Sequence, residues 1–180
     1  MKRVVLVTTG GTIEKTYDER SGELANRRSL VDRMLEELRL EDVEVEVVEL
    51  MSKDSLYMTE DDRARVVAAV RGAEAEDADG HDASELAGIV ILHGTDTLCR
   101  TGRRLHAELP RPRVAVVLTG AMRPFEMKRS DALQNLTEAI FASRVLAPGV
   151  YCVAHGRALP FPGVAKDPER GTFVAGENPA

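Results

Sequence analysis

The chain has no tryptophan, and aromatic residues make up only 4% of its 180 residues. Any hydrophobic core must therefore be built mainly from Val, Leu, Ile and Ala. Only two cysteines occur, Cys99 and Cys152, which are too few for a disulfide framework and favour a reduced, cytoplasmic setting. The apolar run after Lys2 and Arg3 is too short for a signal peptide. No apolar stretch is long enough to cross a membrane, so we expect no membrane partner.

An excess of basic residues is also missing. The sequence has 24 Lys and Arg against 30 Asp and Glu, which gives a net charge of -6. Binding to nucleic acid requires a surplus of cations to neutralise phosphates, so nucleic acid is not an expected partner. With 43% apolar and 30% charged residues, the composition is that of an ordinary globular protein. We expect one domain over residues 1–180, because this length suffices for one core.

Short apolar runs alternate with segments of helical periodicity. The predicted strands are 4–7, 43–47, 88–92, 114–118 and 150–153, and the predicted helices are 29–40, one starting after Thr59, 97–109 and 130–146. Alternating strands and helices with apolar strands predict a doubly wound α/β fold, with a mainly parallel sheet and helices on both faces. Valines alternate with glutamates over 43–47, which favours a place near the sheet edge. Ser29 and Thr59 are predicted helix N-caps.

Two segments have weaker signals. Residues 72–87 are small and acidic, and we interpret them as a helix end followed by a solvated loop. His81 and Asp82 in this segment are poor evidence for a metal site. Residues 156–180 are rich in proline and glycine and form either an ordered arm or a loose tail.

Glycine and threonine gather where the predicted strands end. The motifs are TTGGT at 8–12, HGTDT at 93–97, TGAMRP at 119–124 and LMSKDS at 50–55. Ligands of open α/β sheets bind beyond the carboxyl ends of the strands. Adjacent loops with hydroxyls, free backbone N–H groups and a carboxylate suit acyl transfer. A hydroxyl oxygen can attack a carbonyl, backbone N–H groups can bind the oxyanion, and charged side chains can transfer the proton. Each motif alone could also be a tight turn or a helix cap.

The motifs TTGGTI (8–13), ILHGTDTL (91–98) and LTGAMRP (118–124) resemble the signatures of the bacterial-type L-asparaginases, the asparaginase/glutaminase family. They occur in the family's order, each at a predicted strand end, and the resemblance extends to about residue 155. It implies a flavodoxin-like N-terminal asparaginase domain that requires no metal and no cofactor.

The resemblance also implies roles for individual residues. Thr12 corresponds to the primary nucleophile, and Tyr17, on the flexible lid, to its activating partner. Thr95 and Asp96 correspond to the second threonine-centred group. Its lysine is assigned to Lys166, because GVAKD (163–167) in the arm 156–180 fits the family's short lysine motif.

Substrate contacts are implied in the same way. The motif MSKDS (51–55) matches the loop that holds the substrate carboxylate, through Ser52 and Asp54 with Ser55 beside them. Gly11 and Gly94 would contact the substrate through their backbone. Lys53 stands where a neutral polar residue is common in the family.

The implied reaction is hydrolysis of L-asparagine to L-aspartate and ammonia through an acyl-enzyme on the threonine. The usual family member is nearly twice as long and has a second, smaller domain that completes the amino-group pocket of a neighbouring protomer. This chain resembles a short form without that domain, and Asp96 becomes the candidate for binding the substrate ammonium. We therefore expect a homodimer or a higher homo-oligomer.

Three other functions stay open. A flavin-binding module would need aromatic residues beside the strand ends, and only Tyr57 and Phe125 are candidates. A non-catalytic amino-acid-binding module would keep Ser52 and Asp96 but would not need Tyr17 or Lys166. An amidase for another small amide such as glutamine is a third alternative, because discriminating one methylene group is worth only roughly 1–3 kcal/mol.

The remaining residues of interest have structural interpretations. We expect His93 to be a hydrogen-bonded structural histidine, and His155 to carry little weight unless it has a partner. Arg123 and Pro124 should shape their loop. Cys99 and Cys152 are expected to be small buried hydrophobes.

Overall fold

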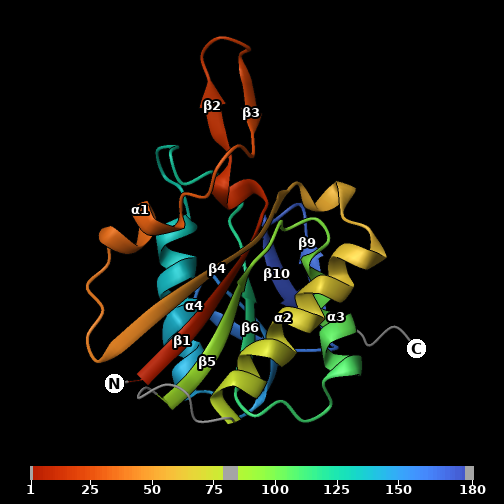
Figure 1. The fold of residues 1–180 in the computed structure, drawn as a ribbon. Helices are drawn as coiled ribbons and strands as arrows, with labels where there is room; N and C mark the ends of the chain where they lie inside the picture. Colours follow the sequence, from red (N-terminus) through yellow and green to blue (C-terminus); the bar gives the residue numbers. More distant parts are fainter. Residues whose placement is uncertain (1, 79–84, 177–180) are drawn as a thin grey trace.

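The computed structural model describes residues 2–78 and 85–176, so His81 and Asp82 lie outside the described residues. A central sheet runs between two layers of helices (Figure 1). Its strands, in spatial order, are β4 (Val43–Lys53), β1 (Lys2–Gly10), β5 (Glu85–Leu92), β6 (Ala115–Thr119), β7 (Gly149–Ala154) and β8 (Arg157–Pro160). Neighbouring strands are parallel except for β7 and β8. The predicted fold class, a mainly parallel α/β sheet, is confirmed.

Both faces of the sheet are covered by helices, as predicted. The helices are α1 (Val31–Glu36), α2 (Glu60–Ala78), α3 (Leu98–Glu108) and α4 (Ala132–Val145). Val5 and Val7 of β1 belong to the core cluster that contains α2 and α3. Val4 and Leu6, which point the other way, belong to the cluster that contains α1 and α4. Alternate residues of one buried strand therefore supply two cores, one on each side of the sheet.

Strand β4 forms one edge of the sheet, which agrees with its alternation of valine and glutamate. It pairs with β1 alone and is longer than predicted, because it continues to Lys53 beside the end of β1. The edge position explains the pattern, since one side of the strand faces solvent along most of its length.

The helix N-terminus after Thr59 was predicted correctly. The Thr59 hydroxyl accepts a hydrogen bond from the Asp62 backbone N–H at 3.2 Å, and the Asp62 carboxylate accepts one from the Thr59 backbone N–H at 2.8 Å. This reciprocal pair closes the first turn of α2.

The helix predicted over 29–40 is shorter than expected. It begins after Leu30 rather than Ser29 and ends at Glu36. The Ser29 hydroxyl still accepts a hydrogen bond from the Val31 N–H at 3.3 Å, but its own proton goes to Glu14. The apolar spacing overestimated the length of this helix. After Glu36 the chain leaves the helix through a turn in which the Leu38 N–H donates a hydrogen bond to the Leu35 carbonyl at 3.1 Å.

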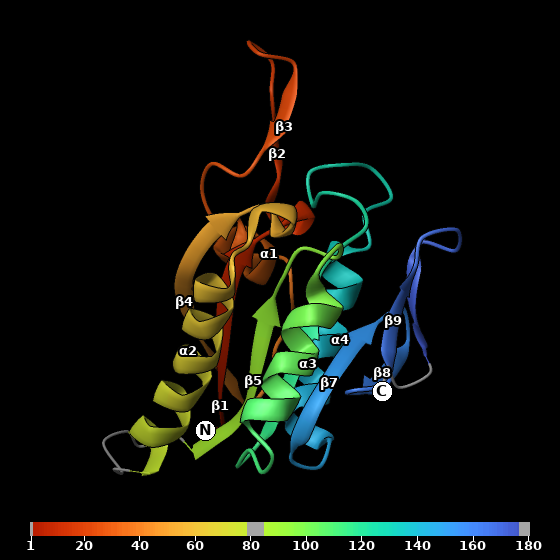
Figure 2. The ribbon, with the colours of Figure 1, turned by 90° about the vertical axis from the view of Figure 1, so that its right-hand side faces the viewer.

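Two hairpins were not predicted. The first consists of β2 (Thr16–Asp18) and β3 (Glu23–Ala25) and projects from the carboxyl end of the sheet (Figures 1 and 2). The second consists of β9 (Val164–Asp167) and β10 (Thr172–Ala175) and follows β8. The described part of the arm 156–180 is thus ordered, and it adds an antiparallel strand and a hairpin beside β7 (Figure 2).

Candidate active site

The turn that carries Thr12 follows β1 directly. Gly10 and Gly11 have φ angles of 91° and 81°, a left-handed conformation that glycine adopts at little cost. A Cβ on Gly11 would lie 2.5 Å from Gly94 Cα, and a Cβ on Gly10 would lie 2.5 Å from the backbone nitrogen of Lys53. The glycines therefore let the Thr12 turn pack against the loop after β5 and the end of β4.

The loop after β5 holds a second hydroxyl group, and a distant lysine reaches it. The Lys166 Nζ donates a hydrogen bond to Thr95 Oγ1 at 2.9 Å and lies 2.5 Å from Asp96 Oδ1. Thr95 is only 4% exposed, whereas the side chain of Lys166 is 22% exposed. Lys166 comes from β9, so the second hairpin supplies the lysine of this group. The structure thus brings three of the five predicted catalytic residues into direct contact.

Ser55 contributes a third hydroxyl group beside the same loops. It is 1% exposed, and a Cβ on Gly94 would lie 2.5 Å from its Oγ. Among the residues that the structure describes, none offers a hydrogen-bond partner to Ser55 Oγ. Leaving a buried hydroxyl unsatisfied costs about 1–3 kcal/mol, so an arriving polar ligand would be stabilised there.

Ser52 and Asp54 have different surroundings from Ser55. Ser52 is exposed on the edge strand β4. Asp54 caps the short helix η2 (Ser55–Tyr57) by accepting a hydrogen bond from Leu56 N–H at 3.0 Å. The hydrogen bond from Lys15, at 2.6 Å, lowers the pKa of Asp54.

Tyr17 lies on β2, in the hairpin that projects from the sheet (Figure 2). Its side chain is 58% exposed. Within the described part of the chain, no hydrogen bond joins it to Thr12. The fold places Thr12, Thr95, Asp96 and Lys166 at the end of the sheet, but it leaves Tyr17 on a separate projection.

A family model for the N-terminal part of asparaginases matches residues 3–167. The chain belongs to the asparaginase family. It is 32% identical over 149 residues to the L-asparaginase of Thermococcus kodakarensis, which covers 83% of this chain and 43% of that protein. It is also 31% identical over 155 residues to a component of the glutamyl-tRNA(Gln) amidotransferase of Methanobrevibacter smithii, covering 86% of this chain and 34% of that protein.

The structural comparison agrees. The solved structure of the thermostable L-asparaginase from Thermococcus kodakarensis matches with a TM-score of 0.80 and 29% identity, covering 96% of this chain and 51% of that one. This asparaginase-family chain therefore spans only about a third to a half of the length of these relatives.

Two residues near the site of this asparaginase-family chain were missed by sequence reasoning. Lys15 pairs with Asp54, and Glu14 is a buried carboxylate at the end of η1 (Thr12–Glu14). The only available signal was two adjacent charged residues directly after the apolar Ile13. Lys53, whose role was open, pairs with Asp62 of α2 at 2.6 Å. That hydrogen bond, followed by the one from Thr59, lowers the pKa of Asp62 to about 2.

His93 is a structural histidine, as expected. It is fully buried, and its ring nitrogens contact the Gly94 carbonyl at 2.9 Å and Thr101 Oγ1 at 2.8 Å. Burial lowers its pKa to about 4. The neutral ring donates to the carbonyl and accepts from the hydroxyl, which holds the loop that carries Thr95.

His155 has the partners on which its importance was expected to depend. Its Nε2 lies 2.8 Å from Asp131 Oδ2, and its Nδ1 lies 2.8 Å from Thr172 Oγ1. These contacts connect the start of α4 to β10, the strand that pairs with β9 and therefore supports Lys166. Sequence could not reveal them, because the three residues are far apart along the chain.

The loop around Arg123 and Pro124 is held by Asp131, which accepts hydrogen bonds from the backbone N–H groups of Met122 and Arg123 at 3.0 Å. Burial alone would raise the pKa of Asp131, but the hydrogen bonds from Met122, His155 and Arg123 together outweigh it and lower the pKa. The loop shape therefore depends on a carboxylate at the start of α4.

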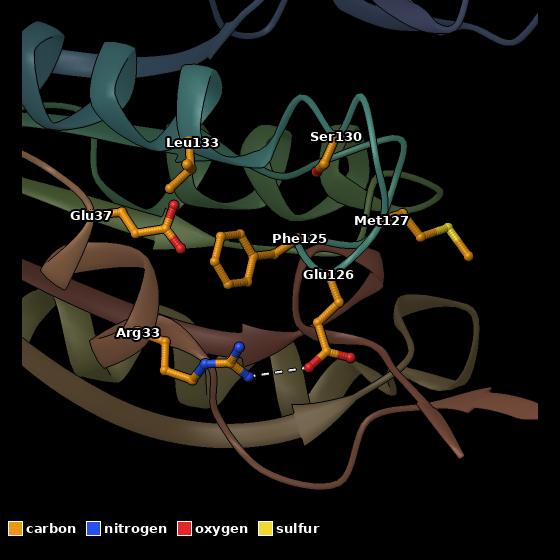
Figure 3. Close-up of a pocket in the computed structure, with 7 residues that line it drawn as sticks. All are labelled: Arg33, Glu37, Phe125, Glu126, Met127, Ser130 and Leu133. Atoms are coloured by element: carbon orange, nitrogen blue, oxygen red, sulfur yellow. Dashed lines mark hydrogen bonds and ion pairs between the residues drawn. The ribbon is translucent and has the colours of Figure 1, made fainter. Parts of the chain in front are cut away.

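A cavity of about 550 Å³ lies between α1 and this loop (Figure 3). It is lined by Arg33, Glu37, Phe125, Glu126, Met127, Ser130 and Leu133. The Arg33 guanidinium lies 5.8 Å from the centre of the Phe125 ring and pairs with Glu126 at 3.1 Å. None of the predicted site residues lines this cavity.

The cysteines are free thiols: Cys152 is buried and Cys99 partly buried, and burial raises the pKa of both. In the described ranges, no three His, Cys, Asp or Glu side chains are grouped as a metal site would require. None of the helices described there is both long enough and apolar enough to span a bilayer.

Proposed function

We propose that this chain carries the catalytic machinery for hydrolysis of L-asparagine to L-aspartate and ammonia. The observation that carries the proposal is the 2.9 Å hydrogen bond between Lys166 and Thr95 beside the Thr12 turn. Close packing of Gly11 on Gly94 keeps the two threonine loops adjacent. A nucleophilic hydroxyl next to a hydroxyl–amine pair is a suitable arrangement for acyl transfer.

The reaction has two steps. The Thr12 oxygen forms a bond to the side-chain amide carbon, its proton passes to the amide nitrogen, and the C–N bond breaks to release ammonia. A β-aspartyl ester then remains on Thr12. Water attacks this ester while the group formed by Thr95, Lys166 and Asp96 takes its proton. The ester C–O bond breaks, and the proton returns to the Thr12 oxygen.

Substrate binding is assigned to the adjacent loops. Ser55 is the best candidate for donating to the substrate carboxylate, since its buried hydroxyl has no partner among the described residues. Ser52 faces solvent and is the weaker candidate. The backbone N–H of Gly94 would hold the developing oxyanion, whereas the Gly11 N–H donates to the Lys53 carbonyl at 3.0 Å. Asp96 would contact the substrate ammonium.

Tyr17 enters the proposed mechanism through movement of its hairpin. The exposed phenol must approach Thr12 to assist removal of the Thr12 proton. Folding the β2–β3 hairpin over the bound substrate would bring Tyr17 in and exclude water from the ester.

A second copy of the chain is proposed to complete the pocket. Leu56 and Tyr57 lie on η2 next to Ser55 and are 64% and 76% exposed, so they offer an apolar surface beside the site that a second copy would cover. Analytical ultracentrifugation should show a homodimer or a larger homo-oligomer. A Leu56→Asp variant should shift the chain to monomer and lower activity, and a fully active wild-type monomer would contradict this part of the proposal.

The decisive test is ammonia release from L-Asn, L-Gln and D-Asn, with Thr12→Ala as the control. We expect turnover of L-Asn by the wild type and none by the variant. The relatives named as components of glutamyl-tRNA(Gln) amidotransferases make L-Gln the second candidate substrate. Equal inactivity of both proteins would reject the enzyme proposal, and calorimetric binding of L-Asn without turnover would favour the amino-acid-binding module.

A further inference from the structure

A buried carboxylate lies two residues beyond Thr12. Glu14 is 2% exposed at the end of η1. Its Oε2 accepts a hydrogen bond from the Thr8 hydroxyl and another from the Gly10 backbone N–H, the latter at 3.2 Å. Both donors belong to β1. This oxygen therefore fastens the Thr12 turn to the end of the strand that precedes it.

The other carboxylate oxygen faces the start of α1. Glu14 Oε1 accepts a hydrogen bond from the Ser29 hydroxyl at 2.6 Å and one from the Leu30 N–H at 3.2 Å. Residues 14 and 29 flank the segment 15–28, which contains the hairpin with Tyr17. The Ser29–Glu14 hydrogen bond thus joins the two ends of this segment, here called the hairpin neck. A second hydrogen bond at the hairpin neck runs from Asn26 Nδ2 to the Gly11 carbonyl at 2.8 Å.

The surroundings of Glu14 are unusual for a buried acid. All four donors to the carboxylate are neutral hydroxyl or backbone N–H groups. No ion pair involves Glu14 in the described residues. A buried charge is tolerated only when hydrogen bonds replace its hydration, and hydrogen bonds to a charged group are stronger than neutral ones. Removing any one of the four donors to the Glu14 carboxylate should therefore destabilise the Thr12 turn.

We propose that Glu14 is a positioning residue that orients the Thr12 nucleophile and anchors the Tyr17 hairpin, with one carboxylate oxygen serving each. The inference rests on the proposed amide hydrolysis, in which both Thr12 and Tyr17 take part. The Glu14 side chain holds both the Thr12 turn and the hairpin neck. The hairpin neck therefore keeps a fixed position relative to the Thr12 nucleophile when the hairpin closes.

Glutamine at position 14 tests the whole arrangement. A carboxamide has one acceptor oxygen and two N–H donors. In Glu14→Gln the amide NH2 group must therefore face one of the two backbone N–H donors, and it cannot accept a hydrogen bond from that donor. We expect kcat/KM to fall about 100-fold, the typical loss when a reacting group is misplaced by about 1 Å. Glu23→Gln, which removes the same charge at an exposed position in the hairpin, is the matched control and should keep wild-type kinetics.

Single-donor variants separate the two oxygens. Thr8→Val removes the hydroxyl that donates to Oε2 and that also accepts from the Gly10 N–H at 3.4 Å. Both contacts lie on the strand side of the Thr12 turn, so the variant should lower kcat while amide hydrogen exchange in the hairpin stays unchanged. Ser29→Ala removes the hydroxyl that faces Oε1, and it should speed exchange of hairpin amides and lower kcat/KM, each about tenfold. Ser29→Thr keeps a hydroxyl and should restore both quantities. These variants decide the matter if Glu14→Gln does not fold.

The proposal is overturned if Ser29→Ala and Thr8→Val have wild-type kinetics, or if both change hairpin exchange equally. A failure of the proposed function is distinguishable, because the wild type would then release no ammonia from any amide. In that case the exchange measurements still decide whether Glu14 anchors the hairpin.

Discussion

At the scale of single residues, the partners of a lysine determine what it can do. Lys53 and Lys166 each pair with a carboxylate, Asp62 and Asp96 respectively, at 2.6 Å and 2.5 Å. Only Lys166 also donates to a buried threonine hydroxyl. The pair on α2 therefore has a structural role, whereas the pair on β9 lies beside the proposed nucleophile.

Lys166→Met tests this distinction, with Lys53→Met as the control. We expect Lys166→Met to lower kcat at least about 1,000-fold, because the proton relay of the proposed second step is lost. Lys53→Met should retain most of the activity. Steady-state ammonia release, with circular dichroism as a check on folding, measures both, and retained activity in Lys166→Met would remove that lysine from the mechanism.

The low pKa of the buried His93 predicts that the protein loses stability in mild acid. Its pKa is about 4 in the fold, below the ordinary value of 6.5, because burial disfavours the charged ring. The unfolded chain therefore binds a proton first as the pH falls, and stability decreases between about pH 6.5 and pH 4. The expected loss from this group is about 3 kcal/mol.

Urea unfolding at several pH values measures this loss. A His93→Gln variant should be less stable at neutral pH, because it disturbs the contacts to Gly94 and Thr101. Its stability should also depend less on pH in the same range. An unchanged pH dependence in that variant would mean that other groups cause the acid sensitivity.

At the scale of elements, local signals predicted well where a side chain acts within its own turn. The cap at Thr59 and the exposed pattern of β4 depend on residues only a few positions apart. Helix α1 was predicted too long for the opposite reason. The apolar spacing continues to residue 40, but Ser29 directs its hydroxyl to Glu14 and the chain leaves the helix after Glu36.

Thr59→Ala should destabilise the protein by about 1 kcal/mol, because the N–H of Asp62 loses its acceptor in the first turn of α2. Thr137→Ala is a suitable control. Thr137 is exposed within α4 and donates only to the Leu133 carbonyl of its own helix, and alanine has the higher helix propensity. Thermal or urea unfolding of both variants measures the difference, and equal stabilities would show that the cap contributes nothing.

At the scale of the whole molecule, the site exists because strand order places certain loops side by side. β1 lies between β4 and β5, so the turn after β1 touches both the end of β4 and the loop after β5. Lys166 arrives from β9, beyond the opposite side of the sheet from β4 (Figure 2). No local feature of the chain determines these neighbours.

Comparing Gly11→Ala with Gly22→Ala measures how much the close packing of the loops after β1 and β5 contributes to the free energy of unfolding. Both glycines have positive φ, 81° and 72°, so both alanines bear a similar backbone strain. A Cβ at Gly22 meets nothing within 4 Å, whereas one at Gly11 collides with the backbone of Gly94. We expect Gly11→Ala to cost roughly 1–3 kcal/mol more in unfolding free energy and to lose activity. Equal effects of the two substitutions would contradict direct packing of the loops.

By itself, the sequence determined the alternation of strands and helices, the mainly parallel sheet, the edge strand and the loops that hold hydroxyl groups. These follow from periodicity and turn chemistry over a few residues. The motifs also nominated Thr12, Thr95 and Lys166 through resemblance to a family. Only the tertiary structure decided that Ser55 rather than Ser52 is buried beside the loops, that His155 binds Asp131, and that Glu14 closes the hairpin neck. Those contacts depend on the order of strands in the sheet and on the packing of both cores, which no short stretch of sequence encodes.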